Sequence, residues 1–476
     1  MHIKPAAILV LLPLLVVAVP ARSAESVFLT GATVYDGTGT AALENAVIEV
    51  KGEQIACIGG EATCPVTAGA ETVDVSDRFI TPGLVDAHVH FSQTGWLDGR
   101  PDSRIGHDFY DYEALQQALS ATPDRWYRAY LCSGVTAVYD VGGFPWTLEL
   151  EDHAADHPER PHVRPAGPLI THFEPVFPIF QVLDTGLFLP MRTDEEARAS
   201  VRELAGMGAR AIKVWYLDPP QDETEALDKR LLLIGREARA QGVPLVVHAT
   251  QLRGAKVAVR AGAHMLAHSV RDRHVDEEFL RLARQVGTYY VPTLIVFQNW
   301  TRAIASVAIG KPPSLDDPND CIDAETRRVV QDAARLHATL PDKLRYLARV
   351  ISRRVNEARQ SAIMEENLRR VYEAGIPIAT GTDAGNPLTF HGPSIYREME
   401  AMERAGIPAA EVLVMSTRHG AAAMERLDDF GTLEAGKLAD LIVLREDPGE
   451  STHAFRSITH VMRGGTLHEI TRFAAE

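Results

Sequence analysis

Short apolar runs of strand length alternate with longer, charged stretches of helical period through the middle of the chain. Eight such runs occur, at residues 84–90, 136–141, 168–172, 211–215, 244–248, 265–269, 289–294 and 377–382. The charged stretches between them include residues 193–207 and 224–241. Strands that alternate with helices indicate parallel βαβ units, and eight such units fit an α/β fold of the (β/α)8 TIM-like barrel class.

The two ends of the chain show a different pattern. Residues 26–80 and 432–470 contain short strand-like runs separated by glycine turns. Neither end is long enough to bury a core alone, so we expect the two to pack together as one small β domain. The connection at residues 295–376 is unusually long, and its segment Lys311–Asp320 is a candidate lid over the barrel.

The first 23 residues form a separate segment. Lys4 precedes an uncharged apolar run of 14 residues, Ala6–Val19, which is shorter than the roughly 20 residues that span a bilayer. Small residues follow at Ala21 and Ser23, the two positions that a signal peptidase reads. We therefore expect a signal peptide at residues 1–23, no stable membrane span after cleavage, and an exported protein that is periplasmic or secreted. An uncleaved membrane anchor is the alternative interpretation.

Composition narrows the functional classes. The chain has 476 residues, of which 46% are hydrophobic and 24% charged, as is typical of a globular protein. Its net charge is −16, or −18 once the two basic side chains of residues 1–23 are removed, which disfavours nucleic acid as a partner. Four cysteines are too few for a disulfide scaffold. Cys57 and Cys64 are close enough in sequence to form a disulfide in an oxidising compartment, and two independent buried thiols are the alternative.

Histidines and one aspartate stand at the ends of the predicted strands. His88 and His90 have the i, i+2 spacing that places two side chains on one face of a strand. His248, His268 and Asp383 end three further runs, and active sites gather at the carboxyl ends of barrel strands. Nitrogen and oxygen donors without a thiolate suit a Zn²⁺-like catalytic site, with Mn, Co, Ni or Fe as alternatives. Asp383 can also accept a proton from water at such a site.

Lys213 lies in the apolar run Ala-Ile-Lys-Val-Trp, inside a predicted strand. Burying an ammonium group without a partner is costly, so this side chain either pairs with an acid or loses its charge. In the second case its amine can add CO₂ to give a carbamate, an anionic ligand with two oxygens that can bridge two cations. The alternative is a buried lysine held by a salt bridge.

These motifs resemble the amidohydrolase superfamily, in the branch of imidazolonepropionase-like proteins and metal-dependent Xaa-Pro and Xaa-Arg dipeptidases. The resemblance covers nearly all of residues 27–470, and it rests on Pro82–His90, Ile212–Val214, His248, His268, Gly381–Gly385 and Gly431–Leu444.

The resemblance implies a metal-dependent hydrolase barrel at residues 81–425, beside a composite β-sandwich domain formed by residues 24–80 and 426–476. It also implies two divalent metal ions, with zinc favoured. His88 and His90 would hold the more buried ion, and His248 and His268 the second. Lys213 would be the carboxylated bridge, and Asp383 both a ligand and the proton shuttle. Imidazolonepropionases proper work with one metal and no bridging lysine, so Lys213 favours the two-metal members.

Three further residues are candidates for substrate binding. Tyr216 lies just beyond Lys213, His172 ends the third run, and His391 lies in the loop after Asp383. Arg100 and Arg104 lie in the first long loop, where they could meet an acidic group of a substrate; solvated surface arginines are the alternative.

The leading hypothesis is an enzyme that hydrolyses a C–N bond of a dipeptide or a cyclic amide, with a hydroxide shared by the metals and Asp383 as proton shuttle. The same site could instead act on a lactone, a carbamate or a phosphotriester. An exported metal-binding or ligand-binding protein without catalysis is the alternative of another class, and the presence of all six expected ligands argues against it. The expected partner is a small molecule or dipeptide, and homo-oligomer formation stays open.

Overall fold

The computed structural model describes residues 26–101, 109–172, 186–339, 342, 346 and 357–475. The predicted signal peptide at residues 1–23 and the candidate Arg104 lie outside the described residues.

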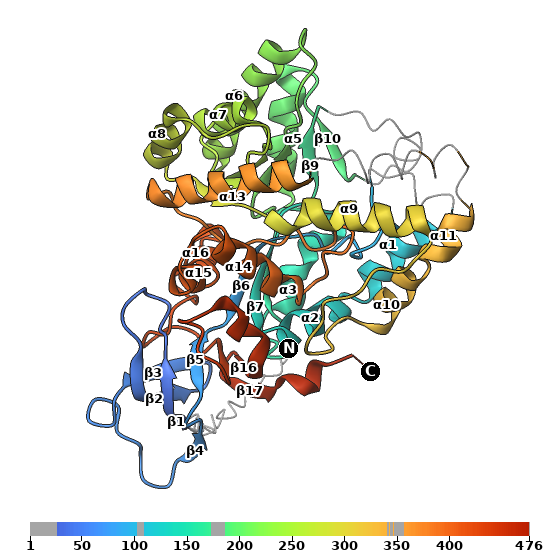
Figure 1. Cartoon of the computed structure of the whole chain (residues 1–476). Helices are drawn as coiled ribbons and strands as arrows, with labels where there is room; N and C mark the ends of the chain where they lie inside the picture. Colours follow the sequence, from blue (N-terminus) through green and yellow to red (C-terminus); the bar gives the residue numbers. More distant parts are fainter. Residues whose placement is uncertain are drawn as a thin grey trace, which may run out of the picture.

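Strands from both ends of the chain form one eight-stranded sheet, which lies at the lower left of Figure 1 in blue and red. Its members are β1 (Ser26–Val34), β2 (Leu43–Lys51), β3 (Gln54–Gly59), β4 (Glu71–Asp74), β5 (Phe79–Pro82), β15 (Leu441–Leu444), β16 (Ile458–Arg463) and β17 (Thr466–Glu469). Strand β5 pairs in parallel with β1 and antiparallel with β15. The first 60 or so described residues and the last 30 or so therefore share one sheet.

The middle of the chain forms two smaller sheets in which every paired strand is parallel. One contains β6 (Leu84–Val89), β7 (Val135–Asp140) and β8 (His162–Pro165). The other has the order β10-β9-β11-β12-β13-β14. Its strands are β9 (Leu169–Thr171), β10 (Phe188–Pro190), β11 (Ile212–Trp215), β12 (Leu245–His248), β13 (Met265–Ala267) and β14 (Tyr289–Val291). Sequence analysis predicted seven of these strands and missed β8 and β10.

Single backbone contacts link the two smaller sheets. The Arg210 amide donates to the Pro165 carbonyl at 2.8 Å, and isolated parallel bridges join Tyr290 to Ile378 and Val89 to Ala384. The eighth predicted strand, residues 377–382, is therefore an extended segment held by bridges and not a regular strand. The arrangement is consistent with a TIM barrel whose ladders are interrupted in two places.

Helices cover the parallel strands (Figure 1). Their bounds are α1 (Tyr112–Ala121), α2 (Asp124–Cys132), α3 (Leu150–Ala154), α5 (Asp194–Gly206), α6 (Thr224–Gln241), α7 (Leu252–Arg260), α8 (Glu277–Val286), α9 (Leu294–Ile309), α10 (Ala324–Gln331), α11 (Ala333–Thr339), α13 (Glu357–Glu373), α14 (Ser394–Arg404), α15 (Ala409–Met415) and α16 (Arg418–Ala423). Local signals explain their ends: Thr193 and Glu196 form a capping box at the start of α5, and α6 ends at the left-handed Gly242.

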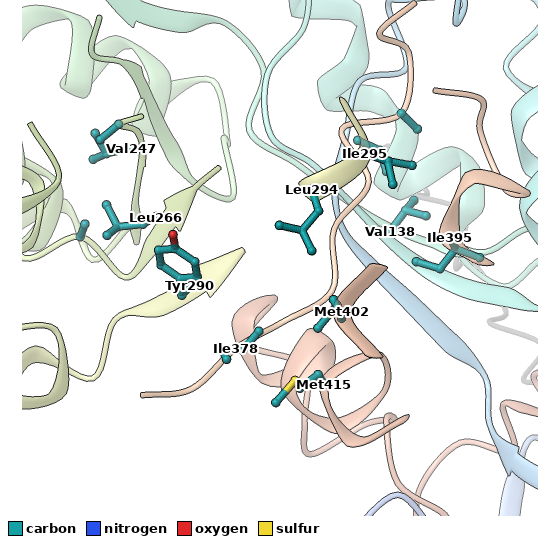
Figure 2. Close-up of a cluster of buried hydrophobic side chains, with 14 of the residues drawn as sticks. Val138, Val247, Leu266, Tyr290, Leu294, Ile295, Ile378, Ile395, Met402 and Met415 are labelled. Carbon is teal, nitrogen blue, oxygen red and sulfur yellow. The ribbon is translucent and has the colours of Figure 1, made fainter. Parts of the chain in front are cut away.

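The largest hydrophobic core lies between these helices and the parallel strands. Figure 2 shows strand residues Val247, Leu266 and Tyr290, with Met402 and Met415 from α14 and α15. All five are buried, so the strands that carry the predicted ligands are packed on the side that faces the helices. No helix in the described ranges combines the length and the apolar character that crossing a bilayer requires.

Two disulfides cross-link the described chain. Cys57 and Cys64 form a disulfide that closes a short loop in the N-terminal strands. They are therefore not two independent buried thiols, which was the alternative that the sequence left open. Cys132–Cys321 was not predicted: it joins the end of α2 to the segment that precedes α10. Near that bridge, Asp316 pairs with Arg456, and Asp317 accepts the backbone amide of Cys321. The predicted lid segment, residues 311–320, is thus anchored to the rest of the protein.

Candidate metal centre and active site

His88 and His90 project from the carboxyl end of β6, a strand buried at all six positions. The ring centroids of the two histidines lie 5.2 Å apart, as the i, i+2 spacing predicts for side chains on one face. Asp86 precedes them on the same face and accepts hydrogen bonds from the backbone amide and the hydroxyl of Thr382, at 2.9 and 2.6 Å. These bonds hold β6 beside the segment that carries Asp383.

Asp383 faces both of these histidines. Its Oδ1 lies 3.4 Å from His88 Nε2 and 3.0 Å from His90 Nε2. Its backbone amide donates to the His88 carbonyl at 2.8 Å, and its φ of 61° places it in the left-handed region, which costs free energy for a non-glycine residue. At Gly381, a Cβ would lie 2.8 Å from the His88 Cβ and 2.5 Å from a Val291 methyl, so the close approach of the two segments requires glycine there.

His248 and His268 complete a continuous cluster of imidazoles. The His268 ring lies 4.8 Å from that of His88 and 4.4 Å from that of His248, and its Nδ1 is 3.8 Å from Asp383 Oδ2. His268 also has a left-handed backbone, with φ of 73°. Nitrogen and oxygen atoms of His88, His268 and Asp383 lie within 4.8 Å of one another, so one cation could contact all three.

Hydrogen bonds fix two of the imidazoles. His90 Nδ1 donates to the Gly142 carbonyl at 2.6 Å, which leaves Nε2 as the lone-pair nitrogen that faces Asp383. His268 Nδ1 contacts the hydroxyl of Thr293 at 2.8 Å. A hydrogen bond from the second ring nitrogen is the usual way in which proteins orient a metal-ligating histidine.

Lys213 is the second residue of β11 and is 2% exposed. It lines the same cavity as His90, His248, His268 and Asp383, so its side chain points inward. No described carboxylate forms an ion pair with it. Burial lowers its pKa to about 8, partly offset by the charges of Asp383 and Asp140, so a neutral amine is accessible at mildly alkaline pH.

Electrostatics favour neutral imidazoles in the cluster. Burial, reinforced by the charge of Lys213, lowers the pKa of His88 and His248 well below the usual value for histidine. Burial and the neighbouring His248 do the same for His268. Neutral imidazoles with a carboxylate are the protonation states that divalent metal ions require.

Some donor atoms of the cluster lack a hydrogen-bond partner among the described residues, which also fits a metal centre. Both ring nitrogens of His88 and Oδ1 of Asp383 are buried without a hydrogen-bond partner among the described residues. Burying a polar atom without a hydrogen-bond partner costs free energy. A cation between His88 Nε2 and Asp383 Oδ1 would give each of these two atoms a partner. The six residues predicted from the sequence therefore lie together with chemistry that suits a metal centre.

A cavity of about 300 Å³ opens over this cluster. One part of its wall is polar and includes Gln93, Arg100, Thr250, Arg271 and Asn386. The rest is mainly apolar, with Leu169, Phe188, Trp215, Phe297, Trp300 and Met364. The long connection after β14 supplies Phe297 and Trp300 from α9 and Met364 from α13, whereas its predicted lid segment 311–320 contributes nothing to this wall.

The three predicted substrate residues are not part of the cavity wall. The Tyr216 hydroxyl donates to Asp228, and the His172 ring packs 5.7 Å from the ring of Tyr216. His391 stacks on Trp126 at 4.0 Å between ring centroids, and its Nε2 donates to the His90 carbonyl at 3.1 Å. None of the three lines the cavity. The geometry gives Tyr216 and His391 a supporting position instead, because the Tyr216 hydroxyl and His391 Nε2 bind other parts of the protein.

Sequence reasoning found Arg100 in the wall but missed Arg271, Trp300 and Asn386. Arg100 donates to Gln93 Oε1 at 2.6 Å and to Asn386 Oδ1 at 2.7 Å. A signal for Arg271 was present, since it lies three residues after His268 in the loop that follows a barrel strand. Trp300 had no such signal, because it comes from α9, a helix that follows the last strand of the parallel sheets.

Comparisons with known proteins agree with this architecture. The sequence model of the amidohydrolase family matches residues 79–467. An imidazolonepropionase from Mesorhizobium japonicum is 26% identical over 441 residues, which cover 87% of this chain and 89% of the relative.

Among solved structures, a Xaa-Pro dipeptidase with bound methionine in its active site is similar, with a TM-score of 0.68 and 24% identity; the match covers 94% of this chain and all of that one. A molinate hydrolase matches with a TM-score of 0.67 and 20% identity, over 94% of this chain and 96% of that one. At these identities the structural matches establish the fold alone.

Proposed function

Because the chain belongs to the amidohydrolase family and is a hydrolase of carbon–nitrogen bonds, we propose that it cleaves the amide bond of a small substrate such as a dipeptide. One observation carries this proposal: four histidines, Lys213 and Asp383 converge beside a cavity of about 300 Å³. That volume is at the small end of ligand pockets, which suits a substrate of dipeptide size. We also propose the finer architecture implied by the resemblance, a barrel at residues 81–425 and a composite β-sandwich from residues 24–80 and 426–476.

The side chains of the site have different roles in the proposed reaction. His88, His90 and Asp383 would hold one divalent ion, and His248 and His268 the other, with zinc favoured by the donor set. Such ions, when bound, supply Lewis acidity to the carbonyl oxygen of the substrate and to a water molecule. Asp383 accepts a proton from the attacking water at a carboxylate oxygen and delivers it to the leaving nitrogen.

Lys213 would bridge the two ions as a carbamate. Its neutral Nζ attacks the carbon of CO₂, an N–C bond forms and one proton leaves, so the product is an anion with two oxygen donors. Its depressed pKa supports this step, because only the unprotonated amine is a nucleophile. The lack of an ion pair to any described carboxylate supports it further.

A dipeptide-library screen tests the proposed function. Protein freed of metal with a chelator should be inactive, and protein reconstituted with Zn²⁺ or Mn²⁺ and bicarbonate should release free amino acids. Lys213→Ala is the matched variant, which should stay inactive under every reconstitution. Activity confined to lactones or phosphotriesters would contradict the proposal and leave the metal centre standing.

We propose, finally, that the protein is exported and processed near Ser23. The two disulfides support this proposal, since structural disulfides persist in oxidising compartments and are rare in the cytosol. Mass spectrometry of protein from the native host tests it: the mature chain should begin near Ser23, and a cytoplasmic chain that starts at Met1 would refute it.

A further inference from the structure

Arg271 stands in the cavity wall, and no carboxylate of the described residues forms an ion pair with it. Its backbone amide donates to the Thr250 carbonyl at 2.9 Å, which fixes the loop between β13 and α8. Its guanidinium lies over the Phe297 ring at 5.3 Å from the centroid. The side chain makes no hydrogen bond or ion pair within the described ranges, in contrast to the neighbouring Arg273, whose Nε binds Asp272 at 2.8 Å.

This guanidinium is both constrained and half-buried. Burial lowers the pKa of Arg271, and no neighbouring carboxylate offsets that effect. An arginine does not relieve the cost of burial by losing its proton, so a bound anion is what would compensate the charge. Arg271 lines the cavity together with His248 and His268.

Arg100, the other arginine of the wall, has a different environment. Two uncharged acceptors of the wall itself, Gln93 and Asn386, take hydrogen bonds from its Nη1, and its guanidinium lies 5.2 Å from the Trp300 ring centroid. The described residues offer Arg271 no such acceptor, so its donors are open to a ligand in the cavity.

The same wall carries aromatic side chains next to these polar groups, since the Phe297 ring packs against Arg271 and the Trp300 ring against Arg100. Phe188 and Trp215 stack with their ring centroids 5.8 Å apart, and Phe297 and Trp300 project from α9. Such surfaces bind a large apolar or aromatic group, through burial and favourable ring geometry. The cavity therefore combines an anion-binding group with an apolar pocket beside the candidate metal centre.

We propose that Arg271 binds the free carboxylate of the substrate, and that the substrate class is an N-acyl amino acid or dipeptide with a large apolar side chain. This inference rests on the proposed function and deepens it. A planar guanidinium matches a carboxylate through two parallel hydrogen bonds, so Arg271 fixes the end of the substrate and thereby sets the position of its amide relative to Asp383.

The first test compares leucyl-phenylalanine with its C-terminal amide as substrates of the zinc-loaded enzyme. The wild type should prefer the free acid by about 10–100-fold in kcat/KM, the effect of one hydrogen bond to a charged group. Arg271→Gln should lose this preference, mainly through KM, with little change for the amide. Arg273→Gln is the control, because Arg273 lies in the same loop and is largely exposed. Preference retained in Arg271→Gln would overturn the inference.

A binding measurement separates failure of this inference from failure of the proposed function. Calorimetry with 3-phenylpropionate and with uncharged 3-phenylpropanol needs no turnover. The wild type and Arg273→Gln should bind the carboxylate about 10–100-fold more tightly than Arg271→Gln does, and the alcohol should not discriminate among them. If no amide is hydrolysed but this difference in binding appears, the result supports the anion site and refutes the proposed function. Equal binding of 3-phenylpropionate by folded Arg271→Gln and wild type would refute the anion site directly.

Discussion

Replacing both Cys132 and Cys321 with serine should lower the free energy of unfolding far more than replacing Cys57 and Cys64. A disulfide removes conformational freedom from the unfolded chain, and the effect grows with the logarithm of the loop that it closes. The two bridges close loops with sequence separations of 189 and 7 residues. The chain-entropy relation gives about 5 kcal/mol for the long loop and about 2.5 kcal/mol for the short one.

Urea unfolding followed by tryptophan fluorescence measures this difference. The two double variants and the wild type should be compared at one pH, with the denaturant slope checked for constancy, because a changed slope would report a different unfolded state. Double variants avoid a leftover thiol. An equal loss in the two variants, or a larger loss for Cys57 and Cys64, would refute the argument from loop length. The Cys132/Cys321 variant should keep its activity below its own unfolding transition, since neither sulfur lines the cavity.

Two further outcomes follow from the site. Asp383→Asn should retain much of its metal, since the amide keeps an oxygen donor, but should lose at least about 10²–10⁴-fold in kcat because it cannot accept a proton; metal analysis with steady-state kinetics checks this, and activity near that of the wild type would remove Asp383 from the mechanism. Lys213→Met should stabilise the metal-free protein in CO₂-free buffer, by up to about 3 kcal/mol below pH 8. The lysine pKa falls from 10.5 to about 8 on folding, so the unfolded state binds more protons between these values and the wild type gains stability as pH rises. The advantage of the variant should therefore shrink from pH 8 to pH 10.5, and a difference that does not vary with pH would refute the assignment.

Much of the site was predictable because neighbouring parallel strands end at the same edge of a sheet. His88, Lys213, His248, His268 and Asp383 could each be placed from local patterns alone, since every one follows or lies within a short apolar run. The parallel pairing of β11, β12 and β13 then brings Lys213, His248 and His268 together. His88 and Asp383 are joined by a backbone hydrogen bond and a neighbouring bridge.

The cavity wall and the supporting residues could not be read in this way. Tyr216 and His391 stand at positions typical of substrate contacts, yet the first binds Asp228 and the second stacks on Trp126. Those partners are set by tertiary packing, which no local pattern records. The same holds for Cys132 and Cys321, whose pairing depends on how the long connection after β14 packs against α2.

The pairing of β5 with β15 has a consequence for how the molecule is made. Strand β5 leads directly into β6 and its histidines, yet one of its edges is completed only when residues 441–444 have been synthesised. At translation rates of 5–20 residues per second, that edge of β5 stays unpaired for roughly 20–70 s. Throughout this interval the nascent chain carries an open strand edge, and such edges are prone to association with other chains. A strand edge that stays unpaired through most of synthesis is therefore a property built into the order of the strands.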